Sequence, residues 1–79
     1  KFKVVEKVKI SSIRDFKKSD LLTIDGIRVN SQNGWWLLRA SNTQAALIAR
    51  AEGYSKKDLE NLLEEISIYL NKAGISWKP

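Results

Sequence analysis

The sequence predicts an α+β domain, with a four-stranded, mainly antiparallel sheet and two helices packed on one face. In the last third of the chain, apolar residues recur at helical spacing. Residues 21–52 contain short runs of residues that favour strands, separated by dipeptides typical of turns. The strands are therefore grouped together with helical stretches outside them, an order typical of layered α+β folds. At 79 residues the chain is long enough for one small domain, assigned to residues 1–79.

The first 17 residues are compatible with a helix or a strand. Val8 and Ile10 alternate as in a strand. Helical spacing is followed roughly by Phe2, Val5, Val8 or Lys9, and Ile13. We adopt the helix for residues 1–17, with a polar join at 17–20 before the sheet.

Turn dipeptides divide the middle of the chain into strands. Asp25-Gly26 separates LLTI from IRVN, and Asn33-Gly34 precedes WWLLRA. Glycine tolerates positive φ, so such dipeptides between β-branched runs favour hairpins. Residues 21–40 are therefore expected to form a three-stranded meander, and AALIARAE, after the polar residues 41–44, a fourth strand.

Strand alternation assigns the side chains to two faces. Ile27 and Val29 share one face, with Arg28 and Asn30 on the other. In the next strand, Trp35 and Leu37 share a face with Arg39, whose guanidinium then lies beside the polar loop. The adjacent Trp35 and Trp36 must point to opposite faces, so only one of them can enter the core.

The last helix is expected at residues 56–72. Ser55 stands three residues before Asp58, as in a capping box, and Gly74 suits the left-handed position after the helix. One broad apolar stripe contains Leu59, Leu62, Leu63, Ile66, Tyr69, Leu70 and Ala73. Ile68 falls opposite this stripe.

Composition excludes several classes of site. The chain has no Cys and no His, which removes disulfides, thiolate nucleophiles and the commonest metal ligand and general base. The nine acidic residues are scattered and form no D-x-D pair, so local metal catalysis is not expected. The net charge of +5 favours an anionic partner.

The sequence gives no indication of a membrane or of export. No stretch approaches 18 apolar residues, and the basic beginning lacks the apolar run of a signal peptide. A cytoplasmic location is the expectation. The first residue is Lys and not Met, which predicts a fragment or a processed product.

One stretch of the sequence suggests a binding site, namely Arg39-Ala40-Ser41-Asn42-Thr43. A phosphate monoester needs several donors converging on one dianion, and an arginine, two hydroxyls, an amide and the N–H groups of a tight turn supply them. The alternative is an ordinary Asx or hydroxyl turn beside a solvated Arg39. Composition alone favours this simpler interpretation.

Residues 25–52, DGIRVNSQNGWWLLRASNTQAALIARAE, resemble the C-terminal domain of the α-D-phosphohexomutases, and most the bacterial phosphomannomutase/phosphoglucomutase branch. That family has an Asp-Gly-(Val or Ile)-Arg-Val strand, a Gly-Trp hairpin, an R-(A/P)-S-(N/G)-T loop and a strand ending near Ala-Glu before a capped helix. The opening KFKVVEKV is similar to the helix that begins this domain, so the resemblance extends across the chain.

The resemblance implies a TBP-like fold and a phosphate-binding role. In the family this is the fourth of four domains, and its loop grips the phosphate that is not reacting during reversible transfer between the 1- and 6-positions of a hexose. The contacts carried over are Arg39, Ser41, Asn42 and Thr43. The loop version RASNT resembles the mannose/glucose branch. Gln44 and Ala45 depart from a family pattern that often includes Pro, so a less rigid exit from the loop is expected.

The resemblance also implies partners that lie outside this chain. The family's phosphoserine and its Mg²⁺ carboxylates belong to other domains, and hexose 1,6-bisphosphate is the intermediate and activator. The expected partners are a phosphorylated mannose or glucose and the other three domains. The chain alone is expected to bind no cofactor and to be catalytically inactive.

Two other classes of function compete with this one. The Trp35-Trp36 pair and the basic charge are compatible with a small module that binds single-stranded nucleic acid, but only one tryptophan is available on each face. A structural or dimerising module requires a contiguous apolar patch that one sequence does not establish. Arg28 and Arg50 are interpreted as solvated or interdomain residues.

Overall fold

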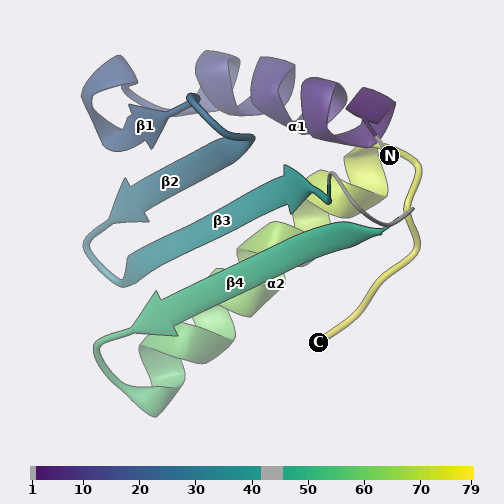
Figure 1. Ribbon diagram of the computed structural model, residues 1–79. Helices are drawn as coiled ribbons and strands as arrows, with labels where there is room; N and C mark the ends of the chain where they lie inside the picture. The colour runs from purple at the N-terminus through teal and green to yellow at the C-terminus, as the bar shows by residue number, and fades with distance from the viewer. Residues whose placement is uncertain (1, 42–45) are drawn as a thin grey trace.

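The structure is a computed structural model that describes residues 2–41 and 46–79. Two helices, α1 (Phe2–Asp15) and α2 (Lys56–Lys72), flank a four-stranded sheet. The strands are β1 (Leu21–Leu22), β2 (Ile27–Ser31), β3 (Gly34–Ala40) and β4 (Leu47–Gly53), and a short 3-10 helix, η1 (Lys18–Asp20), precedes β1. The sheet order is β1-β2-β3-β4, and every neighbouring pair is antiparallel (Figure 1). This confirms the α+β fold predicted from the sequence.

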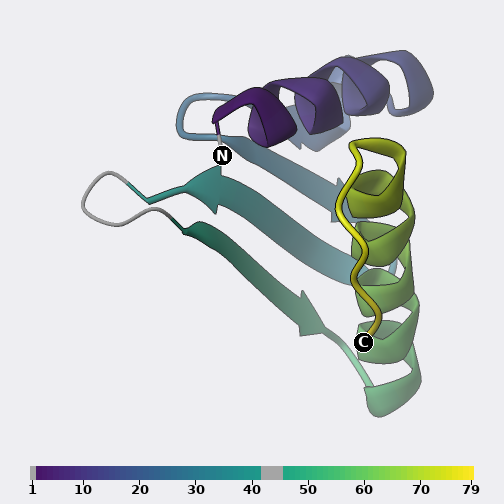
Figure 2. The same cartoon turned by 90° about the vertical axis from the view of Figure 1, so that its right-hand side faces the viewer.

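Both helices cover the same face of the sheet, and none of the described residues forms a helix on the other face (Figure 2). Val8 of α1 and Leu62 of α2 belong to one buried cluster with Ile27, Trp36 and Leu38 of the sheet. Alternation assigns Arg28, Trp35 and other residues between these to the opposite face, which we call the open face. It carries Leu22, Arg28, Asn30, Trp35, Leu37, Arg39, Ile48, Arg50 and Glu52.

The turn between β1 and β2 is longer than the Asp25-Gly26 dipeptide suggested, whereas the turn between β2 and β3 has two residues, 32–33, one position before the Asn33-Gly34 dipeptide. β1 ends at Leu22, so residues 23–26 connect it to β2, and Ile24 is 97% exposed. In the second turn Ser31 pairs with Gly34, which makes Gly34 the first residue of β3. A Cβ at Gly34 would lie 2.0 Å from the Glu52 carbonyl oxygen, so β4 can approach only a glycine there.

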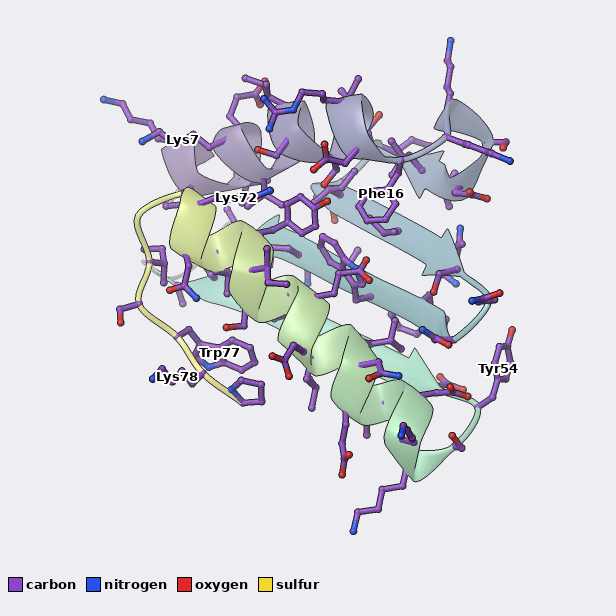
Figure 3. The ribbon with its side chains drawn as sticks, turned by 180° about the vertical axis from the view of Figure 1, so that it is seen from behind. Lys7, Phe16, Tyr54, Lys72, Trp77 and Lys78 are labelled. Carbon is purple, nitrogen blue, oxygen red and sulfur yellow. The ribbon has the colours of Figure 1, made fainter. Side chains whose placement is uncertain are left out.

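The helix α2 agrees closely with its sequence prediction. The Ser55 hydroxyl accepts a hydrogen bond from the Asp58 amide at 3.1 Å, and Gly74 has φ +93° after the helix. The apolar stripe is buried or half-buried, whereas Ile68, on the opposite side, is 49% exposed. After the helix the chain turns back along it (Figures 2 and 3). The Ser67 hydroxyl donates to the Trp77 carbonyl at 2.7 Å.

The helix α1 forms as predicted, but its buried side is rotated from the predicted stripe. Val5, Val8 and Ser12 are buried, whereas Ile13 is 62% exposed. Four residues complete about one helical turn and five overshoot it, so Ser12 follows Val8 on the buried side and Ile13 points outward. Including Ile13 in the stripe was therefore wrong.

A polar contact joins the end of α1 to the end of α2. The Tyr69 hydroxyl donates to Asp15 Oδ2 at 2.8 Å, and Lys72 Nζ lies 3.8 Å from the same oxygen. Phe16 and Trp36 pack against the Tyr69 ring, with ring centroids 5.6 and 5.9 Å from that of Tyr69. The hydrogen bond from Tyr69 holds the pKa of the Asp15 carboxyl below its ordinary value of 3.8.

We expect Tyr69→Phe to reduce stability more at neutral pH than in acid. A lowered native pKa stabilises the fold above the unfolded pKa, and this contribution is lost as pH falls through the native pKa. The free energy of unfolding is measured by urea denaturation between about pH 2 and pH 6. It should decrease less on acidification in the variant than in the native chain. Tyr54→Phe is the control, because Tyr54 is 80% exposed. An equal stability loss at every pH would contradict this role of the hydroxyl.

Candidate functional site at the end of strand β3

The candidate site begins at Arg39, the second-last residue of β3. Trp36, Leu38 and Ala40 point into the core, so the alternate position of Arg39 directs its side chain to the open face. The side chain is 35% exposed. Arg39 is thus placed as the sequence predicted, at a strand end and outside the core.

Ser41 follows β3 directly and is 8% exposed. Its amide donates to the Ala46 carbonyl at 2.9 Å, which ties the end of β3 to the residue before β4. This N–H is therefore already used in the backbone. Asn42 and Thr43, the other two predicted contacts, lie outside the described residues.

A carboxylate lies beside the guanidinium. Arg39 Nη1 is 3.4 Å from Asp25 Oδ2, and the Asp25 side chain is 68% exposed. Asp25 belongs to the turn between β1 and β2, which the register places next to the end of β3. The sequence prediction treated Asp25 as a turn residue and did not pair it with Arg39. The expected meander places this turn beside the end of the strand that carries Arg39, so the contact could have been inferred from it.

The other arginines of the open face have different surroundings. Arg28 Nε donates to Asn30 Oδ1 at 3.1 Å, and its guanidinium carbon lies 4.3 Å from the centre of the Trp35 ring. Arg50 is exposed on β4. The Arg28 guanidinium therefore already contacts Asn30 and Trp35 of the sheet. Arg50 is the exposed arginine whose substitution is compared with that of Arg39 below.

The tryptophan pair divides between the two faces, as alternation predicted. Trp36 is fully buried, and its indole N–H donates to Glu65 Oε1 at 3.0 Å. Trp35 is half-buried on the open face under Arg28. The pair does not form a continuous stacking surface, so the geometry lends no support to single-stranded nucleic-acid binding.

The described residues offer no metal-binding cluster and no membrane-spanning helix. Within residues 2–41 and 46–79 no three acidic side chains gather closely enough to hold a metal ion. Neither of the two described helices is long and apolar enough to cross a membrane. What the site can provide chemically is a positive charge and a hydroxyl at the closed end of a hairpin.

Comparison with known proteins identifies the family. Residues 1–68 match the family model described as "Phosphoglucomutase/phosphomannomutase, C-terminal domain". This chain is a member of that family. The match spans the Asp25–Gly26 turn, Arg39 and Ser41, so the candidate site lies inside the matched region.

Relatives of this phosphoglucomutase/phosphomannomutase C-terminal domain carry two kinds of name. A phosphomannomutase/phosphoglucomutase of Pseudomonas putida is 39% identical over 62 residues, which cover 78% of this chain and 13% of that protein. A phosphoglucosamine mutase of Methanocaldococcus jannaschii is 43% identical over 54 residues, which cover 68% of this chain and 12% of that protein. The chain thus spans only about an eighth of the length of these relatives.

Proposed function

We propose that this domain binds the non-reacting phosphate of a hexose phosphate through Arg39 and Ser41, with Asn42 and Thr43 completing the set. The observation that carries the proposal is the position of Arg39. Arg39 lies on the open face of β3, two residues before Ser41, whose amide is hydrogen-bonded to the Ala46 carbonyl. The chain also belongs to the phosphoglucomutase/phosphomannomutase family. A guanidinium and a hydroxyl are suited to the oxygens of a phosphate dianion.

Binding a phosphate that does not react assists catalysis elsewhere. Contacts to a remote group help to orient the reacting group and to bring it close to its partner. Reversible transfer between the 1- and 6-positions presents first one phosphate and then the other to this site. Donors directed at phosphate oxygens, rather than at one sugar hydroxyl, accept either end.

The complete protein is proposed to be a phosphohexomutase of four domains, acting on mannose or glucose phosphates in the cytoplasm. A phosphoserine in another domain would exchange the phosphoryl group, with hexose 1,6-bisphosphate as the intermediate. Mg²⁺ is proposed to bind in another domain, as the family resemblance implies, and the described residues of this chain gather no three acidic side chains that could hold it. The role of this chain is to bind and orient the substrate, and alone it is expected to be inactive.

The isolated chain should bind phosphosugars weakly. Each charge-assisted hydrogen bond contributes roughly 1.5–3 kcal/mol, but association costs about 4 kcal/mol or more. Three or four contacts of about 2 kcal/mol each therefore leave roughly 4 kcal/mol or less, which corresponds to an affinity of about millimolar or weaker.

Titration of glucose 1-phosphate or mannose 6-phosphate into the ¹⁵N-labelled chain tests this proposal. We expect amide shifts concentrated at residues 41–44, and none with unphosphorylated glucose or mannose. Tyr54, at the other end of β4, provides an internal reference. Shifts confined to Trp35, or distributed over all the lysines, would contradict the proposed site.

A further inference from the structure

The turn between β1 and β2 packs directly against the backbone of Arg39. Gly26 has φ +82°, and a Cβ at this position would lie 2.3 Å from the Leu38 carbonyl oxygen and 2.7 Å from Arg39 Cβ. Both the backbone angle and the lack of space require glycine. The close approach of Gly26 fixes where its neighbour Asp25 lies.

This approach places a carboxylate beside the arginine without occupying all of its donors. The Asp25 carboxylate contacts the guanidinium through Oδ2, which lies 3.4 Å from Arg39 Nη1. A guanidinium has five N–H donors, so one such contact does not exhaust its capacity to bind an anion. Both side chains remain partly accessible, at 35% for Arg39 and 68% for Asp25.

We propose that Asp25 is a positioning residue that holds the Arg39 side chain in the orientation used to bind phosphate. The proposal rests on the function assigned above. An arginine side chain has high rotamer entropy, so a neighbour that restricts it beforehand lowers the entropy lost when the anion binds. Gly26 supports this by keeping the turn against β3.

The same carboxylate also repels an anion, and the two effects have opposite signs. Asp25 is exposed, so water and salt weaken the repulsion; the screening length is about 8 Å at physiological ionic strength. If the charge of Asp25 matters most, its neutralisation tightens phosphate binding. Positioning predicts the reverse, and the direction of the change therefore decides between them.

The experiment is a titration of inorganic phosphate into the ¹⁵N-labelled chain at physiological ionic strength, following the Ser41 amide and the Arg39 Nε–Hε signal. Asp25→Asn should raise the dissociation constant about threefold, the scale of an exposed ion pair, and lower the heteronuclear NOE of Arg39 Nε in the absence of phosphate. Asp25→Glu should restore both values in part. Asp25→Ser is a second variant that removes the charge, and it should change both values in the same direction as Asp25→Asn.

Asp20→Asn is the matched control, because it makes the same charge change on η1. It should leave the Arg39 NOE unchanged and should not weaken phosphate binding. Equal or tighter binding by Asp25→Asn, or an unchanged Arg39 NOE, would overturn the positioning role while leaving the phosphate site intact. If Arg39→Ala does not alter the phosphate shifts, or the native chain shows none, the proposed function itself fails and the positioning role fails with it.

Discussion

In the complete protein that contains this domain, Arg39→Ala is expected to lower kcat/KM for a hexose phosphate by about 10- to 150-fold. Loss of a charge-assisted hydrogen bond costs roughly 1.5–3 kcal/mol, and each 1.4 kcal/mol corresponds to about a factor of ten. Serine phosphorylation itself should remain chemically possible, because the role proposed for Arg39 is to bind the phosphate that does not react. Steady-state kinetics with glucose 1-phosphate or mannose 1-phosphate measure the loss.

Arg50→Ala is the matched control for this kinetic prediction. It removes the same charge from the same open face, on the neighbouring strand β4. We expect it to change kcat/KM far less than Arg39→Ala does. Similar losses in the two variants would indicate a general effect of positive charge, and unchanged kinetics of Arg39→Ala would contradict its assigned role.

Trp36→Ala is expected to remove a large part of the stability of the domain. Trp36 is fully buried and its indole N–H donates to Glu65, so the substitution removes core contacts and the donor to a carboxylate. Replacing a buried tryptophan by alanine costs about 3–5 kcal/mol. A domain of this length has a total stability of roughly 4–12 kcal/mol, so most or a large part of it is lost. Urea denaturation followed by circular dichroism measures the change.

The neighbouring Trp35 provides the control for this stability prediction. Trp35 is half-buried on the open face, and its cation–π contact with Arg28 contributes about 0.5–1 kcal/mol. Trp35→Ala should therefore destabilise the fold much less than Trp36→Ala. Equal destabilisation by the two variants would contradict the assignment of the faces.

The helix α2 and the meander were predictable because each depends on local chemistry. The Ser55 cap, Gly74 and the apolar stripe mark α2, and strict alternation assigns Trp36 to the core and Arg39 to the open face. The rotation of α1 was not predictable in the same way. Ser12 is buried while Ile13 is exposed, and only packing of α1 against the sheet and α2 selects that side.

The candidate site was predictable in part. Its position at the end of β3 follows from strand alternation, but the contact between Arg39 and Asp25 joins residues 14 positions apart. The register of β2 on β3 determines that contact, and the dipeptide Asp25-Gly26 alone indicates only a turn. The contribution of Asn42 and Thr43 stays a prediction, because both lie outside the described residues.

The most direct test of the central claim compares phosphate affinity in three forms of the chain: the native sequence, Arg39→Ala and Arg50→Ala. Glucose 6-phosphate is titrated into each ¹⁵N-labelled form, and the dissociation constant is obtained from the Ser41 amide shift. The account predicts about millimolar binding to the native chain and to Arg50→Ala, and no detectable saturation with Arg39→Ala. Equal affinity in all three forms, or binding without a shift at Ser41, would contradict it.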